Sequence, residues 1–174
     1  MGIERRDFPV GWDRSTGADD NSHSFISSLK FDGARIHAAS IYCSDGRWGE
    51  AFDELCHRHL QIPRYDRWAV PGGPGWLAAS EDSPLVHAAR LQLDFLVKAH
   101  DLERIVLVTH YGCAWYGHLL DRQPDDCLPA QKKDIQMAAA TLNRWYPGLA
   151  IDGYLAMRSR EWLSFHQIEL DSRR

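Results

Sequence analysis

Two short segments of this chain contain the residue types from which a metal centre could be built. Cys43-Ser44-Asp45-Gly46-Arg47 offers a thiol, a carboxylate and a guanidinium, and Thr109-His110-Tyr111-Gly112-Cys113 offers an imidazole and a second thiol. The thiolates of Cys43 and Cys113, with the imidazole of His110, form a ligand set that suits zinc and is one ligand short of the usual four. The open coordination position is where chemistry could occur.

Asp45 and Arg47 could form the polar surroundings of such a centre. If the segment is extended, both side chains point the same way, so the guanidinium can hold the carboxylate in a two-pronged contact. Held in this way, Asp45 could accept a hydrogen bond from a zinc-bound water and orient its lone pair. Released from Arg47, it could instead swing round and occupy the fourth metal position. The two arrangements would be an active and a closed site.

The surrounding sequence places both segments at the ends of strands. Residues 35–43 are small and apolar, as in a strand that ends at the turn 44–46, and residues 105–108 form the apolar, β-branched run of a parallel strand buried on both faces. Residues 113–120 can begin a helix after the turn that Gly112 permits. The carboxyl ends of adjacent parallel strands form a crevice in which ligands bind, so the two segments are expected to meet there.

The rest of the chain alternates between helix and strand patterns. A further helix is expected to begin at Pro84, with Ser83 as its N-cap. The other expected elements are helices over 48–60 and 131–146, strands over 65–70, 150–157 and 162–170, and loops over 71–75 and 124–129. This order predicts an α/β fold with a mostly parallel central sheet, helices on both faces and a C-terminal edge hairpin.

The composition indicates one globular domain with a full-sized core. Of the 174 residues, 44% are hydrophobic and 25% are charged. Residues 1–30 show no sustained periodicity, so we expect an irregular N-terminal arm there and a single α/β zinc-binding domain over 31–174. Within the arm, Phe8, Val10 and Trp12 suggest that part of it docks on another surface.

Charge and hydropathy narrow the range of partners. The formal net charge of -4 and the lack of a Lys/Arg run argue against nucleic acid. Apolar runs such as 105–108 are far too short to span a bilayer, and no apolar stretch of a secretion signal follows Arg5 and Arg6. We therefore expect a cytoplasmic protein whose partner is a small molecule. Four cysteines are too few for a disulfide scaffold, which leaves metal binding or burial to explain them.

The pattern CxDxR at 43–47, followed by Gly72 and by HxxC at 110–113, resembles the β-class carbonic anhydrases. The segment 151–154 is also similar to the final strands of that family, so the resemblance covers residues 35–170. It implies reversible hydration of carbon dioxide to bicarbonate by a zinc-bound hydroxide. The implied site is one Zn2+ per chain on Cys43, His110 and Cys113, with Asp45 and Arg47 as an orienting or gating dyad. A homodimer or higher homo-oligomer is implied as well.

Departures from the family pattern leave alternatives open. Residues 69–73 replace the family's Arg-Asn-Ala-Gly-Asn run, Ala114 replaces a glycine, and the arm is short where the family has helices that clasp a neighbouring subunit. The glutamine that many members contribute to the substrate pocket has no evident counterpart. The alternatives are a carbonyl sulfide or carbon disulfide hydrolase on the same site, a non-catalytic zinc-stabilised binding domain, and a metal-free α/β interaction domain.

Other residues with chemical potential have simpler explanations. Cys56, His57 and His59 diverge on a helix, which favours a core thiol beside a solvated face over a second ligand cluster. Residues 73–78 match a dinucleotide fingerprint but lack a helix that begins there. We interpret Cys127 as a loop thiol, His118 as a surface residue rather than a proton shuttle, and the tryptophans 48, 68, 76 and 115 as packing residues.

Overall fold

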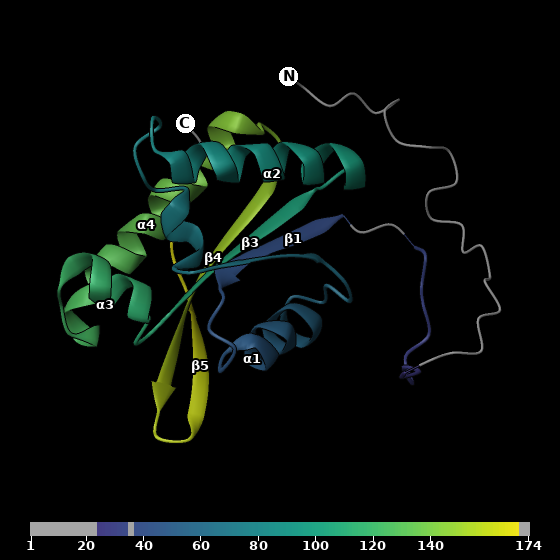
Figure 1. Cartoon of the computed structure of the whole chain (residues 1–174), viewed down its shortest axis with the longest axis horizontal. Coiled ribbons are helices and arrows are strands. Elements are labelled where there is room, and N and C mark those ends of the chain that lie inside the picture. The colour runs from purple at the N-terminus through teal and green to yellow at the C-terminus, as the bar shows by residue number, and fades with distance from the viewer. Residues whose placement is uncertain (1–23, 35–36, 171–174) are drawn as a thin grey trace.

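Five strands form one sheet in the computed structural model of the chain, which describes residues 24–34 and 37–170. The spatial order is β2-β1-β3-β4-β5 (Figure 1). The bounds are β1 Ala38–Cys43, β2 Asp66–Val70, β3 Arg104–His110, β4 Ala150–Ser159 and β5 Trp162–Gln167. Neighbouring strands are parallel except β4 and β5, which are antiparallel and form the hairpin that projects beyond the sheet in Figure 1. The predicted mostly parallel sheet with a C-terminal edge hairpin is confirmed.

Both faces of the sheet are covered by helices, as the sequence predicted. Ile41 and Leu107 pack on one face with residues of α2 (Pro84–His100) and α4 (Pro124–Trp145). The neighbouring residues Tyr42 and Val108 point to the other face and pack with α1 (Gly49–Glu54) and the π-helical η2 (Leu55–His59). Because successive side chains of a strand face opposite sides, the central strands β1 and β3 are buried on both faces.

The start of α2 follows the capping signal in the sequence. The Ser83 hydroxyl accepts a hydrogen bond from the backbone N–H of Leu85 at 3.2 Å, and Pro84 occupies the first turn. The last turn ends at Asp101, which adopts a left-handed backbone conformation. This helix supplies Ala89 and Leu93 to the core, both fully buried.

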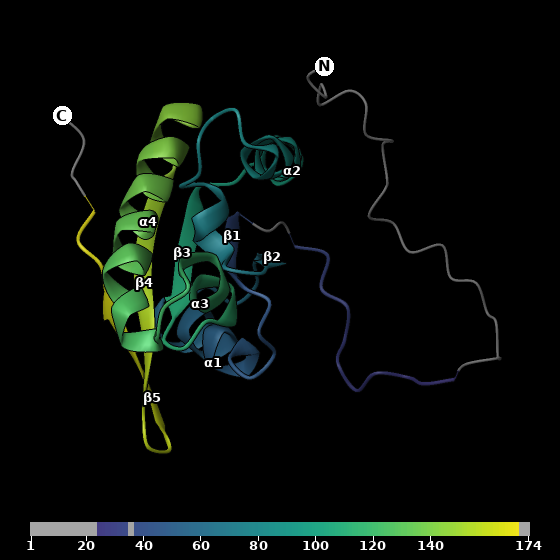
Figure 2. The ribbon, with the colours of Figure 1, turned by 60° about the vertical axis from the view of Figure 1, so that its left-hand side comes forward.

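The N-terminal half of α4 corrects two predictions. Residues 124–129, expected to form a loop, are the first turns of the helix, with Pro124 in the first turn. Asp125 and Asp126 lie there as well, where their charges complement the helix dipole. Pro129 lies inside the helix, and Cys127 is buried at 3% exposure rather than placed in a loop. Figure 2 shows α4 running along the strands.

Smaller differences concern helix types and the ends of the chain. The predicted helix over 48–60 divides into α1 and η2, and the predicted loop over 71–75 contains a short 3-10 helix, η3 (Gly73–Trp76). The docking of Phe8, Val10 and Trp12 lies outside the described residues. No helix in the part of the chain that the structure describes is both long and apolar enough to cross a membrane.

Candidate metal centre

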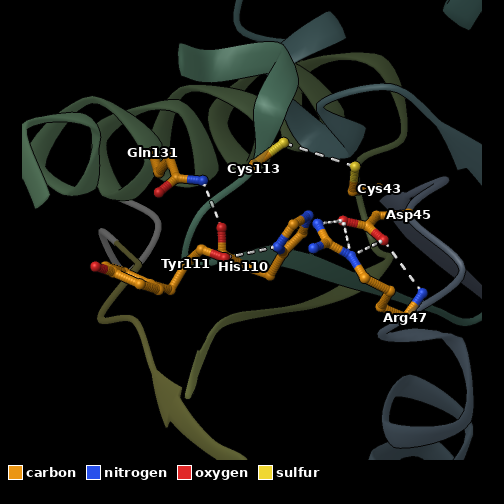
Figure 3. Close-up of polar contacts among 7 residues, drawn as sticks. All are labelled: Cys43, Asp45, Arg47, His110, Tyr111, Cys113 and Gln131. Carbon is orange, nitrogen blue, oxygen red and sulfur yellow. Dashed lines mark hydrogen bonds and ion pairs between the residues drawn. The ribbon is translucent and has the colours of Figure 1, made fainter. Parts of the chain in front are cut away.

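Cys43, His110 and Cys113 come together at the carboxyl ends of two adjacent strands. Their ligand atoms all lie within 4.8 Å of one another, and the two sulfur atoms are 3.6 Å apart. Cys43 ends β1, His110 ends β3, and Cys113 is the N-cap of α3 (Ala114–Leu120). Since β1 and β3 pair in parallel, their ends lie side by side (Figure 3). The strand-to-helix turn that Gly112 allows, with a φ of 69°, brings the second thiol back toward the first.

The imidazole of His110 has one nitrogen that the protein leaves without a partner. Its Nδ1–H donates to the carbonyl oxygen of Tyr111 at 2.9 Å, so Nε2 carries the free lone pair. The residue is fully buried and Nε2 has no hydrogen bond. The Trp48 ring packs against the imidazole, with centroids 4.8 Å apart. A buried nitrogen without a partner needs an explanation, and a bound cation beside the two sulfurs of Cys43 and Cys113 provides one.

The two thiols have opposite proton affinities. The pKa of Cys43 is lowered to about 4, first by the hydrogen bond from Cys113 and then, against the effect of burial, by His110 and the backbone N–H groups of Gly72 and Asp45. The pKa of Cys113 is raised, mainly because its proton is shared with the Cys43 sulfur. One thiolate is therefore favoured by the protein itself, and a divalent cation would release the remaining proton.

Arg47 holds the carboxylate of Asp45 with two prongs. Arg47 Nε lies 2.9 Å from Asp45 Oδ1 and Arg47 Nη2 lies 2.5 Å from Oδ2, while the Arg47 backbone N–H donates to Oδ1 at 3.1 Å. These contacts lower the pKa of Asp45 to about 2. The Asp45 side chain is 18% exposed and that of Arg47 is 73% exposed, and Figure 3 shows the contact between them. The Asp45 carboxylate is thus paired with the Arg47 guanidinium.

A glycine-rich segment supports the end of β1. A Cβ atom on Gly73 would lie 2.7 Å from the carbonyl carbon of Tyr42, and one on Gly72 would lie 2.3 Å from the Trp115 ring. Both glycines also have positive φ, 78° for Gly72 and 53° for Gly73. These glycines let the backbone of the segment pass close to the end of β1, where Cys43 lies.

Three residues of α4 face the centre and were not predicted: Cys127, Gln131 and Asp134. Cys127 belongs to the same buried cluster as Cys43 and Cys113. Gln131 donates to the carbonyl oxygen of His110 at 2.8 Å, and Asp134 accepts from the Tyr116 hydroxyl at 2.7 Å. Spacings of four and three residues put the three side chains on one side of a helix. Pro124 followed by two aspartates was the sequence signal for the start of this helix.

The remaining candidates lie apart from the centre. Cys56 is fully buried, whereas His57 and His59 are exposed, so they do not converge on a common point. His118 is exposed on α3. Trp68 and Trp76 pack edge to face in the core. Among the residues that the structure describes, the group of possible metal ligands is the one predicted from the two motifs.

Comparison with known proteins supplies a family and a fold. The family model described as "Putative carbonic anhydrase" matches residues 34–165. The crystal structure of the β-carbonic anhydrase CafA of Aspergillus fumigatus is similar, with a TM-score of 0.50, 12% identity and 76% of each chain covered. A tetrameric β-carbonic anhydrase of Sordaria macrospora has a TM-score of 0.48 and 14% identity over 76% of this chain and 82% of that chain. No curated protein matches the sequence.

Proposed function

This chain belongs to the "Putative carbonic anhydrase" family, and on that premise we propose that it catalyses the zinc-dependent, reversible hydration of carbon dioxide to bicarbonate. The observation that carries the proposal is the group formed by Cys43, His110 and Cys113, whose ligand atoms lie within 4.8 Å of one another. His110 also has a buried Nε2 without a hydrogen-bond partner, which is available to a metal ion. Two sulfurs and one nitrogen match the donor set of a catalytic zinc site that keeps one position open.

The residues of the two motifs have distinct roles in this proposal. Cys43, His110 and Cys113 would hold one zinc ion per chain, and zinc bound there would lower the pKa of a water molecule to about 7 and so supply a nucleophile at neutral pH. The Asp45 carboxylate accepts a hydrogen bond from the attacking water and orients its lone pair. Arg47 keeps that carboxylate ionised and directed away from the ligands, which preserves the open position.

The surroundings of His110 suit a small apolar substrate. The ring centroids of Trp48 and Phe52 lie 4.8 and 6.4 Å from that of the imidazole, and both rings are buried. Carbon dioxide carries no charge and no permanent dipole, so aromatic walls can surround it at little desolvation cost. Carbonyl sulfide and carbon disulfide are also small and linear, and they are the natural alternative substrates for the same residues.

Stopped-flow hydration of carbon dioxide by the zinc-loaded protein tests the proposal. We expect the wild-type chain to accelerate pH change above the buffer rate, and His110→Ala to abolish the acceleration because a ligand is lost. His118→Ala is the matched control, since this histidine is exposed on α3 and should leave the rate unchanged. Hydration at the buffer rate by zinc-loaded wild-type protein would overturn the proposal, and turnover of carbonyl sulfide alone would identify the alternative substrate.

We also propose that the chain forms a homodimer or a larger homo-oligomer. Large apolar side chains in the segment 24–34 are widely exposed in the single chain: Phe25 at 85%, Ile26 at 73%, Leu29 at 83% and Phe31 at 81%. Such a group marks a surface for association with another protein chain. Sedimentation velocity should show at least a dimer, and the double variant Phe25→Ser, Phe31→Ser should shift it toward the monomer. A monomeric wild-type protein at high concentration would contradict this assignment.

A further inference from the structure

The side chain of Gln131 joins α4 to the end of β3 next to the proposed metal ligand His110. Gln131 is fully buried. Its Nε2 donates to the His110 carbonyl oxygen at 2.8 Å (Figure 3). It also donates to the Thr109 hydroxyl oxygen at 3.0 Å. One side-chain amide therefore restrains two consecutive residues at the point where the strand turns toward Cys113.

The orientation of this amide follows from its partners. A carbonyl oxygen can only accept, so the atom that faces the His110 carbonyl must be the NH2 group of Gln131. The other end, Oε1, is then buried and has no hydrogen-bond partner. A buried acceptor without a donor destabilises a fold, and an apolar side chain of the same size would avoid that cost. The hydrogen bonds of Gln131 therefore serve to hold the end of β3 in place rather than to improve core packing.

Two hydrogen bonds in series connect Gln131 to the free nitrogen of His110. Gln131 holds the carbonyl of the peptide unit between His110 and Tyr111. The next carbonyl, that of Tyr111, accepts the Nδ1–H of the imidazole at 2.9 Å. The first contact thus fixes the backbone that carries the second, and the second fixes the plane of the ring and the direction of Nε2.

We propose that Gln131 is a positioning residue of the metal centre, which aims Nε2 of His110 at the point between the sulfurs of Cys43 and Cys113. The inference rests on the metal centre of the proposed function. Docking of α4 itself does not depend on Gln131, because Ile135, Ala138 and Leu142 anchor the helix in the core with no exposed surface. Loss of the amide should therefore change metal binding more than it changes folding.

Zinc affinity, measured by competition with a chromophoric chelator, tests the proposal without any turnover. Gln131→Met has a similar length and no donor, and we expect it to weaken zinc binding by about 10- to 100-fold, the usual effect of removing a partner that orients a ligand. Gln131→Glu should recover most of the affinity, because a buried carboxyl stays protonated and can donate its O–H to the His110 carbonyl. The cobalt-substituted Gln131→Met protein should also show a shifted ligand-field absorption spectrum.

Gln136→Met is the matched control on the same helix. Gln136 is exposed, and its Nε2 donates to the carbonyl oxygen of Glu169 at 3.2 Å, away from the centre. This variant should keep wild-type zinc affinity and the wild-type cobalt spectrum. Equal effects of Gln136→Met and Gln131→Met would overturn the positioning role, since they would reflect a general change in α4.

The remaining outcomes separate this inference from the proposed reaction. Wild-type affinity and an unshifted cobalt spectrum in Gln131→Met would overturn the inference, as would equal losses in Gln131→Met and Gln131→Glu. If Gln131→Met does not fold, Gln131→Asn withdraws the donor by one carbon and should still weaken binding; unchanged affinity in it overturns the inference. A wild-type chain that binds zinc without hydrating carbon dioxide overturns only the reaction, and one that binds no zinc overturns both.

Discussion

The chain contains two groups of cysteine and histidine, and only one of them converges. Cys43 lies 70 residues before Cys113 in the sequence, yet the ligand atoms of these two residues and of His110 meet within 4.8 Å. Cys56 and His57 are adjacent in sequence yet separate, with the thiol fully buried and the imidazole exposed. Neighbouring residues on a helix point in different directions, whereas the ends of parallel strands gather side chains from far apart. The convergence of Cys43 with His110 and Cys113 therefore depends on the order of the strands in the sheet rather than on sequence spacing.

The two groups also differ in the pKa of their buried thiols. Cys43 and Cys56 are both buried, at 7% and 0% exposure. The pKa of Cys43 is lowered, chiefly by the hydrogen bond from Cys113, whereas the pKa of Cys56 is raised because desolvation dominates. Burial alone raises the pKa of a thiol, so a partner is needed to reverse it. The first thiol is suited to bind a cation and the second to fill a core.

Removal of one converging thiol should have the largest effect. Zinc sites in small domains bind with about 10–16 kcal/mol, so one of three protein ligands is worth about 4 kcal/mol, or about 1,000-fold in affinity. We expect Cys113→Ser to lose zinc by that amount in a chelator competition. Cys56→Ala should retain wild-type zinc affinity even where its stability falls. If Cys56→Ala lost zinc and Cys113→Ser did not, Cys56 rather than Cys113 would be the zinc ligand.

A chelator should destabilise the protein by removing zinc from Cys43, His110 and Cys113. A ligand present at 100 times its dissociation constant stabilises the folded state by about 2.7 kcal/mol. Chelator treatment of the zinc-loaded chain should therefore lower its Tm in thermal unfolding, because the stabilisation by bound zinc is lost. Cys56→Ala should show the same drop. A Tm that does not respond to chelation in wild-type protein would contradict a bound metal.

Two aspartate–arginine pairs allow the surroundings of Cys43 and of Cys56 to be compared in a second way. Asp45 pairs with Arg47 beside the centre, and Asp53 pairs with Arg67 near Cys56. Asp45→Asn should lower kcat/KM by about 10- to 100-fold with zinc content unchanged, because the amide orients the attacking water less well. Asp53→Asn should leave kcat/KM per bound zinc unchanged. Equal losses in both variants would show that the Asp45 effect is not local.

The smallest effect should be a change in the acid stability of Asp53→Asn. Burial tends to raise the pKa of Asp53, but hydrogen bonds from Tyr65 and Arg67 outweigh it, so the pKa is lowered. A folded pKa below the unfolded value contributes stability above the unfolded value, about 3.9, and this stability is lost as the pH falls through the folded pKa.

Asp53→Asn should therefore lower the free energy of unfolding at pH 7 by about 1 kcal/mol, a value reduced by the partial exposure of the pair. Urea unfolding from pH 3 to pH 8 should show that the difference from wild type narrows below pH 4. A constant difference across this range would mean that packing, rather than the ionised carboxylate, causes the loss.

The parts of the fold that the sequence predicted are those with local signals. The apolar run of β3 and the Ser83-Pro84 cap each specify their element within a few residues. The start of α4 was missed because Pro129 lacks an N–H and normally interrupts a helix. Burial of Cys127 against the metal centre belongs to the tertiary contacts that keep the helix intact there. Such compensation is invisible in the local sequence.

In the candidate site too, the residues with a local sequence signal were predicted and the others were not. Cys43, His110 and Cys113 are found from the two motifs because strand ends must meet. Gln131 could not be found, because its partners are a backbone carbonyl and a hydroxyl on a strand more than twenty residues earlier in the chain. A glutamine on a helix is usually solvent-exposed, and only the packing of α4 reveals this one as buried.

The backbone conformation and surroundings of Gly73 limit which residue can occupy position 73. Gly73 has a positive φ, and a Cβ atom on it would lie only 2.7 Å from the Tyr42 carbonyl carbon, so the position excludes even the methyl group of alanine. In a saturation library selected for folded protein, residue 73 should therefore remain glycine while the exposed surface accumulates substitutions. In this chain the absence of a side chain at residue 73 is therefore what lets the segment after β2 pack directly against the strand that carries Cys43.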